Sequence, residues 1–220
     1  MRSCVWGSGV EPGKLIIFDL DGTLVDSCQD LATAVNLMRR HFGLPALAPE
    51  SIRGYVGNGV RMLVTRALQG TRIDVDEALK VQMPLYRAHA VDQTGLYPGV
   101  FEGLKCLRER GHILAVATNK PAESCDLILR HLGIYDWFIT VLAADRFPVL
   151  KPAPDMITNC MATAGVTPRN TWVVGDNYTD LESARRAGAN SIFVTYGYGA
   201  PGNEVPTYQC DSFDAVLELI

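Results

Sequence analysis

The chain has 220 residues, of which 48% are hydrophobic and 20% are charged, and its formal net charge is −4. This composition is typical of a soluble globular protein with one good-sized domain, or with a core that carries a smaller insert. The negative balance argues against nucleic acid or an anionic membrane as the main partner, because the overall field attracts neither.

The chain begins with a stretch, Met1–Lys14, that has no apolar run of the kind found in a secretory signal. No later segment has the length of apolar sequence that a membrane span needs. The six cysteines are scattered, without a C-x-x-C pair or histidines at zinc-ligand spacing, so we expect reduced thiols. We therefore expect a cytoplasmic protein in which a short leader precedes the fold.

Short apolar runs then alternate with amphipathic helical patterns along most of the chain. Each run predicts a buried strand, because both of its faces are apolar and β-branched residues are frequent. The expected strands are Leu15–Phe18, His112–Ala117, Phe138–Leu142, Thr171–Val174 and Ser191–Val194. The expected helices of this part are Gly99–Arg110, Pro121–Leu132, Pro154–Ala164, Thr179–Ala187 and Ser212–Leu219. The alternation predicts an α/β fold, a parallel sheet with helices on both faces.

Residues 27–92 interrupt this alternation, because they contain helix patterns and no strand-like run. The helix patterns lie at Asp30–Phe42, Val60–Leu68 and Asp76–Ala90. We therefore expect an all-helical insert at residues 27–92, placed after the first strand. The α/β core is then discontinuous and consists of residues 1–26 and 93–220.

Polar residues follow the expected strands, or the loop that leads into a strand. Open parallel sheets bind their ligands at the carboxyl ends of the strands, so these positions are candidates for a functional site. The candidates are Asp19, Asp21, Thr23, Thr118, Asn119, Lys151, Asp176 and Asp180.

The first two candidates, Asp19 and Asp21, would repel each other in a confined site. Such crowding raises the pKa of a carboxylate unless a cation offsets it. Mg²⁺ is the expected cation because it accepts a few carboxylates and keeps waters and phosphate oxygens as further ligands. Asp176, at the end of another strand, supplies a third anionic ligand, so we expect Mg²⁺ to be bound by Asp19, Asp21 and Asp176.

A metal in this position would orient a substrate phosphate and neutralise part of its charge. Asp19 could then attack phosphorus, and Asp21 could protonate the leaving oxygen and later activate water. Thr118, Asn119 and Lys151 are suitable donors to the phosphoryl oxygens, and Lys151 would offset the developing negative charge.

Each candidate also has a simpler explanation when it is taken alone. An isolated Asp-x-Asp is common on solvated loops, and Thr118-Asn119 could cap the following helix. Lys151 could be a surface lysine, and Asp180 could be an acid in the first turn of a helix. The joint position of all these groups at one edge of the expected sheet favours the functional interpretation.

These residues resemble the motifs of the haloacid dehalogenase superfamily. Phe18–Ser27 is similar to the first motif, Thr118-Asn119 to the second, Lys151 to the third and Gly175–Asp180 to the fourth. The resemblance covers nearly the whole chain, and it implies a Rossmann-like core with a mobile helical cap. It also implies that Asp19 is the nucleophile and Asp21 the general acid and base. An acid at position 21 is a feature of the phosphatases of the superfamily and not of the dehalogenases.

The same resemblance implies that Asp180 holds Lys151 or a metal-bound water rather than the metal itself, and that Thr23 belongs to the substrate-binding residues. Some shorter segments are similar to bacterial phosphoglycolate phosphatases. These segments are Gly57–Arg61, Tyr97–Val100, Ala117–Pro121, Pro148–Pro152 and Thr195–Gly199. We therefore expect a small phosphorylated metabolite as substrate, with 2-phosphoglycolate first.

Substrate selection should come from the cap, because the core motifs contact only the phosphoryl group. The glycine-rich turn Gly54–Gly59 is a candidate for the cap loop that reaches the substrate, and Arg53 and Arg61 flank it. Both arginines could pair with a substrate carboxylate, and Arg61 is the one that we place among the substrate-binding residues. The alternative is that both are solvated charges at helix ends.

Other functions stay open at this point. Sugar phosphates, amino-sugar phosphates or pyrophosphate are alternative substrates, and a phosphomutase of the β-phosphoglucomutase type is an alternative activity. A non-catalytic phosphate-binding module is disfavoured, because it would not need a nucleophile and an acid/base together. We expect a monomer or a homodimer.

Overall fold

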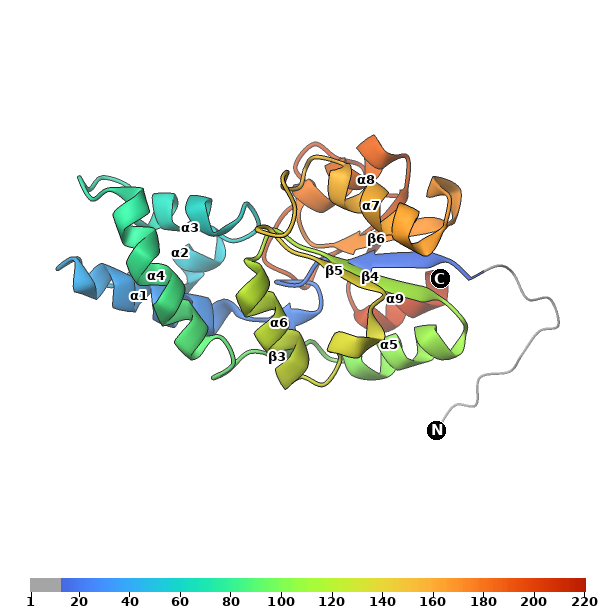
Figure 1. Cartoon of the computed structure of the whole chain (residues 1–220), viewed down its shortest axis with the longest axis horizontal. Helices are drawn as coiled ribbons and strands as arrows, with labels where there is room; N and C mark the ends of the chain where they lie inside the picture. Colours follow the sequence, from blue (N-terminus) through green and yellow to red (C-terminus); the bar gives the residue numbers. More distant parts are fainter. Residues whose placement is uncertain (1–12) are drawn as a thin grey trace.

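The computed structural model describes residues 13–220, so the expected leader lies outside the described residues except for Gly13 and Lys14. These two residues precede the first strand, and the side chain of Lys14 donates a hydrogen bond to the carbonyl of Ile220. Figure 1 shows an α/β lobe and a helical lobe, with the carboxyl ends of the central strands directed toward the helical lobe.

The α/β lobe is built on a parallel sheet with the strand order β5-β4-β1-β6-β7-β8. The predicted fold class is confirmed. Its strands are β1 (Leu15–Phe18), β4 (Ile113–Ala117), β5 (Thr140–Leu142), β6 (Thr171–Gly175), β7 (Asn190–Val194) and β8 (Tyr208–Cys210). The edge strand β8 is an addition to the expected elements, because its two exposed residues and single buried one do not form an apolar run.

Helices cover both faces of the sheet (Figure 1). One face carries α5 (Val100–Glu109), α6 (Ala122–His131) and α9 (Phe213–Leu219), and the other carries α7 (Asp155–Ala164) and α8 (Tyr178–Ala187). Two short 3₁₀ helices, η1 (Tyr135–Trp137) and η2 (Pro168–Asn170), connect these elements.

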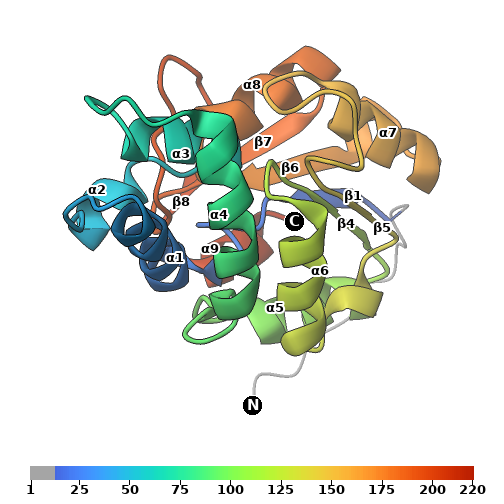
Figure 2. The same ribbon diagram turned by 60° about the vertical axis from the view of Figure 1, so that its left-hand side comes forward.

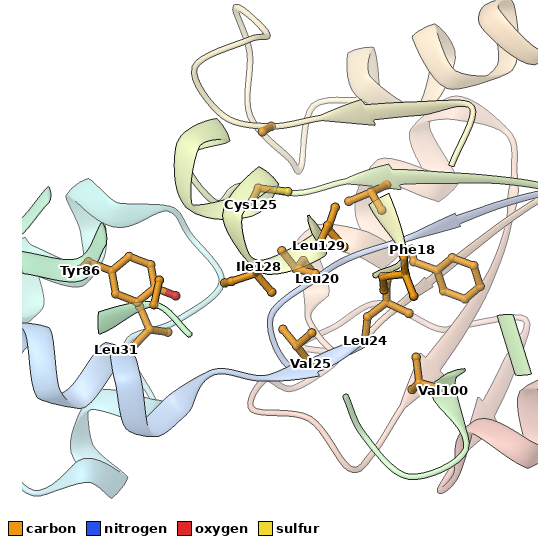
Figure 3. Close-up of a cluster of buried hydrophobic side chains, with 14 of the residues drawn as sticks. Phe18, Leu20, Leu24, Val25, Leu31, Tyr86, Val100, Cys125, Ile128 and Leu129 are labelled. Carbon is orange, nitrogen blue, oxygen red and sulfur yellow. The ribbon is translucent and has the colours of Figure 1, made fainter. Parts of the chain in front are cut away.

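The central strand β1 divides its side chains between the two faces. Ile16 and Phe18 pack with the α5, α6 and α9 side, whereas Leu15 and Ile17 pack with α7 and α8. This alternation follows from the two-residue period of a strand, and it explains why all four residues are apolar. Burial of each such side chain stabilises the fold by about 1.5–3 kcal/mol. Figure 3 shows the cluster on the Phe18 side, which continues to Leu31 and Tyr86 in the helical lobe.

The helical lobe consists of α1 (Cys28–His41), α2 (Pro49–Arg53), α3 (Val60–Ala67) and α4 (Val75–His89). Helix α1 packs chiefly against α4, and the two lie side by side in Figure 2. Helix α2 was not among the expected elements, because its five residues are too few for a periodic pattern.

Helix α4 presents one face to the interior of the protein. Its N-cap residue is Asp74, whose side chain accepts hydrogen bonds from the backbone N–H groups of Asp76 and Glu77. Its buried residues, Ala78, Gln82 and Tyr86, are four positions apart and therefore lie on one face. A glutamine on that buried face is unusual, because buried side chains of this type need hydrogen-bond partners.

The chain enters and leaves the helical lobe through two paired segments. Strands β2 (Val25–Asp26) and β3 (Gly95–Leu96) are antiparallel, with Val25 opposite Leu96 and Asp26 opposite Gly95. Strands of two residues give no sequence pattern, so this pair was not expected. Within residues 13–220, no helix has the length and apolar character that crossing a membrane requires.

Candidate active site

Asp19 leaves the buried strand β1 at its carboxyl end, and its backbone N–H donates to the carbonyl of Val174 at the end of β6 (3.0 Å). The chain then turns sharply, because the backbone N–H groups of Leu24 and Val25 both donate to the carbonyl of Leu20 (3.0 Å each). Gly22 has a φ of +83° in this turn, and a Cβ at this position would collide with the carboxylate of Asp176. The local sequence thus brings the first motif against the end of β6.

Three buried carboxylates, those of Asp19, Asp176 and Asp180, form an acidic cluster whose ligand atoms lie within 4.8 Å of one another. Among residues 13–220, Oδ1 of Asp19 has no hydrogen-bond partner. A buried carboxylate oxygen without a hydrogen bond, beside two further carboxylates, fits a hard divalent cation. Of the metal ligands expected from the sequence, the structure therefore brings Asp19 and Asp176 together.

The carboxylate of Asp176 is held by three hydrogen bonds. The hydroxyl of Thr23 donates to its Oδ1 (3.2 Å), and the backbone N–H groups of Tyr198 and Gly199 donate to its Oδ2 (2.7 and 3.0 Å). Thr23, expected among the substrate-binding residues, is fully buried and makes this contact to the acidic cluster. The loop Thr195–Gly199, which the sequence showed only as a similar segment, supplies the backbone donors.

Burial, together with the nearby negative charge of Asp19, raises the pKa of Asp176 to about 6. Both effects penalise the charged form. A bound cation would relieve both, so the acidic cluster is suited to a metal at neutral pH.

Lys151 lies between two of these carboxylates. Its Nζ is 2.6 Å from Oδ1 of Asp180 and 3.1 Å from Oδ1 of Asp19, although the second contact lacks hydrogen-bond geometry. Burial alone would lower the pKa of Lys151, but the carboxylates of Asp180 and Asp19 raise it above its ordinary value. The lysine is therefore a fixed positive charge next to Asp19. The contact between Asp180 and Lys151 is the one that the family resemblance implied.

Asp180 is positioned by the start of helix α8. Its Oδ2 accepts a hydrogen bond from the backbone N–H of Asn177 (3.1 Å), and the side chain of Asn177 accepts one from the backbone N–H of Thr179 (3.3 Å). This reciprocal arrangement is a capping box. One carboxylate thus caps the helix with one oxygen and binds Lys151 with the other.

Asp21, which we expected as a metal ligand, is not part of this acidic cluster, and its side chain has other partners. Its Oδ1 accepts hydrogen bonds from the hydroxyl of Ser27 (2.5 Å) and from Nζ of Lys120 (2.7 Å), and Nζ of Lys120 is also 2.9 Å from its Oδ2. A buried ammonium thus turns this carboxylate away from Asp19 and Asp176. The separation suits two carboxylates with different chemical roles.

A pocket between the two lobes contains both Asp19 and Asp21. Its core side is formed by the loops that follow β1 and β4. Its other side is formed by the helical lobe, hereafter the cap, which contributes residues from α1, the turn before α3, α3 and one face of α4. The lining residues are Asp19, Asp21, Thr118, Asn119, Lys120 and Pro121 from the core, and Leu31, Val56, Gly57, Gly59, Val60, Leu63, Gln82 and Tyr86 from the cap. The glycine-rich turn expected to reach the substrate therefore contributes to the wall.

Thr118 and Asn119 follow β4, as expected, but their side chains make different contacts. Thr118 is buried at the pocket wall, where its hydroxyl accepts a hydrogen bond from the backbone N–H of Lys120 (3.3 Å). The amide of Asn119 donates to the carbonyls of Lys151 (3.0 Å) and Gly57 (3.1 Å) and accepts from the backbone N–H of Lys151 (2.9 Å). Asn119 therefore joins the Lys151 loop to the cap, whereas we expected it to contact a phosphoryl group.

The two arginines beside the glycine-rich turn are directed elsewhere. Arg61 is exposed and pairs with Asp76, and it is not among the described residues that line the pocket. Arg53 donates to the carbonyl of Gly197 (2.7 Å) and lies over the ring of Tyr198. In this structure Arg61 is an exposed charge paired with Asp76, which is the arrangement expected from the alternative that the sequence left open.

Lys120 and two cap residues, Gln82 and Tyr86, belong to the site although sequence reasoning did not select them. Lys120 is buried, and besides Asp21 it donates to the hydroxyl of Tyr86. The signal for Lys120 was its place directly after Thr118-Asn119 at a strand end. The signal for the other two was weaker, a four-residue spacing on one helix face.

A parallel α/β core with a buried carboxylate cluster, a buried lysine and a helical cap defines a class, hydrolases with a capped α/β core. The sequence profile of the haloacid dehalogenase-like hydrolases matches residues 16–194 of this chain. The chain belongs to this family.

Individual relatives agree with the family profile. A phosphoglycolate phosphatase from Pseudomonas putida is 40% identical over 214 residues, which cover 93% of this chain and 78% of that protein. One from Vibrio vulnificus is 38% identical over 218 residues, with 94% and 96% covered. The crystal structure of a predicted phosphoglycolate phosphatase from Haemophilus somnus 129PT has a TM-score of 0.86 and 30% identity, and the match covers 97% of this chain and 99% of that one.

Proposed function

We propose that this protein is a Mg²⁺-dependent phosphatase that hydrolyses a small phosphomonoester, 2-phosphoglycolate first, with Asp19 as the nucleophile. One observation carries the proposal: Asp19 and Asp21 line the same pocket but are held by different partners. Asp19 lies with the acidic cluster and Lys151, where a phosphoryl group and a cation would meet. Asp21 lies with Lys120 and Ser27, on the side where a leaving group would be.

The reaction follows from these positions. A carboxylate oxygen of Asp19 forms a bond to phosphorus while the ester P–O bond breaks, and the leaving oxygen takes a proton from Asp21. Water then gives a proton to Asp21 and attacks phosphorus, which breaks the acyl-phosphate bond and returns the Asp19 carboxylate with inorganic phosphate. Lys151 and the hydroxyl of Thr118 offset the charge on the phosphoryl oxygens.

The acidic cluster fits Mg²⁺, since its donors are carboxylate oxygens and one of them is buried without a hydrogen bond. Asp19 and Asp176 would hold the ion, while Asp180 keeps Lys151 in place. When bound, Mg²⁺ supplies positive charge that lets adjacent carboxylates and a phosphate share one small space.

The relatives support 2-phosphoglycolate as the first substrate to test. Those at 40% and 38% identity are phosphoglycolate phosphatases.

The test is phosphate release from a set of substrates in the presence of Mg²⁺. The set contains 2-phosphoglycolate, sugar phosphates, amino-sugar phosphates, nucleotides and pyrophosphate, and we expect the highest kcat/KM for 2-phosphoglycolate. Asp19→Asn should reduce the rate on every substrate by at least about a thousandfold, because the variant lacks the nucleophile. Asp136→Asn, which changes an exposed aspartate in the same way, serves as the matched control.

Two outcomes would contradict the proposal. Activity of Asp19→Asn equal to that of the control would exclude the covalent mechanism. Formation of isomeric sugar phosphates without free phosphate would instead identify a phosphomutase.

A further inference from the structure

The cap contributes a buried amide without a partner to the active-site pocket. Gln82 on α4 is fully buried and lines the pocket, and among residues 13–220 neither its Nε2 nor its Oε1 has a hydrogen-bond partner. Such an amide is costly unless something satisfies it, and folded proteins rarely keep one without a reason. The rest of the buried face of α4 carries ordinary packing residues such as Ala78.

A second donor lies one helical turn further along the same face. The hydroxyl of Tyr86 accepts a hydrogen bond from Lys120, so its own proton is available to an acceptor in the pocket. Burial raises the pKa of Tyr86 to about 12, so the hydroxyl keeps this proton at neutral pH. Residues four apart on a helix project side by side, so Gln82 and Tyr86 offer adjacent donors to one ligand group.

The position of Gln82 and Tyr86 relative to Asp21 indicates which part of the substrate they contact. Lys120 contacts both Tyr86 and Asp21, so the pair is next to the carboxylate that would protonate the leaving oxygen. The proposed phosphoryl site is at Asp19 and Lys151, whose contacts are separate from those of Asp21. The cap residues therefore face the leaving group. The arginines that could have recognised a carboxylate, Arg53 and Arg61, make other contacts.

We infer that Gln82 and Tyr86 are the specificity-determining residues, and that they bind an acceptor oxygen on the leaving group, either a carboxylate or a hydroxyl one carbon from the ester-bearing carbon. This inference rests on the proposed phosphatase activity but not on 2-phosphoglycolate as the substrate. The amide of Gln82 donates to this oxygen, and so does the hydroxyl of Tyr86. A leaving group without the oxygen leaves both donors unpaired in a closed pocket and is discriminated against.

The test compares three phosphomonoesters of similar size. 2-Phosphoglycolate carries the carboxylate, 2-hydroxyethyl phosphate carries the hydroxyl, and ethyl phosphate carries neither. The variant is Gln82→Leu, which keeps the size of the side chain and removes both polar atoms. The matched control is Gln69→Leu at an exposed glutamine of the same lobe.

We expect Gln82→Leu to reduce the ratio of kcat/KM for an oxygen-bearing substrate to that for ethyl phosphate by about 10- to 100-fold. Gln69→Leu should leave this ratio as in the wild type. The midpoint of thermal unfolding of Gln82→Leu should not fall below that of the wild type, because an unpaired buried amide has been removed. A fall in the ratio for 2-phosphoglycolate identifies the recognised oxygen as a carboxylate oxygen, and a fall in the ratio for 2-hydroxyethyl phosphate identifies it as a hydroxyl oxygen.

Two results would overturn the inference. In the first, Gln82→Leu lowers kcat/KM equally for all three compounds, which indicates a packing role. In the second, the ratios are unchanged. A wild-type enzyme that is inactive on 2-phosphoglycolate but active on the other esters would refute only the proposed substrate, because the comparison of 2-hydroxyethyl phosphate with ethyl phosphate still tests Gln82.

Discussion

Nζ of Lys120 lies 2.7 Å from Oδ1 and 2.9 Å from Oδ2 of Asp21, and the same ammonium group donates to the hydroxyl of Tyr86 in the cap. One buried cation therefore joins the first motif, the end of β4 and helix α4. The orientation of the Asp21 carboxylate therefore depends on a contact with the cap. A cap that moves away removes one of the contacts that hold Lys120.

The first prediction concerns this contact. Lys120→Met should lower kcat by about 100-fold, because Asp21 loses the partner that orients it for proton transfer. KM should change much less, since Lys151 and the acidic cluster still bind the phosphoryl group. Steady-state kinetics of the variant and of Lys105→Met, which changes an exposed lysine of α5, provide the measurement. A loss confined to KM would contradict a role in positioning Asp21.

The second prediction concerns Lys151. Lys151→Met leaves the buried carboxylates of Asp19 and Asp180 without their shared cation. We expect a fall of about 3 kcal/mol in the free energy of unfolding measured without metal, and a loss of activity of at least about 100-fold. Lys80→Met removes an exposed lysine that pairs with Glu77. It should change the free energy of unfolding much less than Lys151→Met does, because an exposed ion pair contributes little to stability, and equal losses in the two variants would refute the argument.

The third prediction uses two glycines with nearly the same φ, Gly22 at +83° and Gly70 at +80°. An alanine at either position carries the backbone cost of a positive φ, about 1 kcal/mol. A Cβ at position 22 would also collide with the carboxylate of Asp176, whereas at position 70 nothing lies within 4 Å. Gly22→Ala should therefore abolish most activity and weaken Mg²⁺ binding, while Gly70→Ala retains both. Titration with Mg²⁺ and a phosphate-release assay distinguish them.

The fourth prediction is a dependence of stability on pH in the absence of metal. The folded-state pKa of Asp176, about 6, is above its ordinary value of 3.8. The folded protein therefore binds more protons than the unfolded chain between these two values, so its stability falls as pH rises through this window. A pKa shift of this size contributes about 3 kcal/mol to the free energy of unfolding at low pH, and this contribution is lost as pH rises through the window. Chemical denaturation in EDTA at several pH values measures it.

Asp176→Asn is the control for this measurement, because the amide does not titrate. The unfolding free energy of the wild type should therefore fall relative to that of the variant as pH rises from 4 to about 7. In the wild type, Mg²⁺ should raise the unfolding midpoint more at neutral pH than at pH 5, since the ion binds the charged carboxylate. A difference that is constant with pH would contradict the raised pKa of Asp176.

The sequence alone predicted those parts of the fold and site that depend on local patterns. Apolar runs identified five strands of the core sheet, and the residues that follow them included Asp19 and Asp176, which the structure places in one cluster. The rule that parallel strands present their carboxyl ends at one edge was sufficient for this step.

Other parts depended on contacts that no local pattern carries. Asp21 was expected as a metal ligand, and its contact with Lys120, which is distant in sequence, was not expected. Arg61 was expected at the substrate because of its place beside a flexible turn, yet Asp76 on the next helix pairs with it. Helix periodicity placed Gln82 and Tyr86 on a buried face of α4, but it did not show that this face meets the active site.

The antiparallel pair β2–β3 has a consequence for how this protein family can change. Because Val25 lies opposite Leu96, the chain leaves the core and returns to it at adjacent points. The two ends of the cap segment are therefore held close together at the core. Because loop-closure entropy depends only weakly on the length of the segment between such ends, replacement of the cap costs little in this respect. On our inference that Gln82 and Tyr86 bind the leaving group, exchange of the segment between the two strands changes the substrate range. The new segment has to keep a contact to Lys120, because that lysine holds the carboxylate of Asp21.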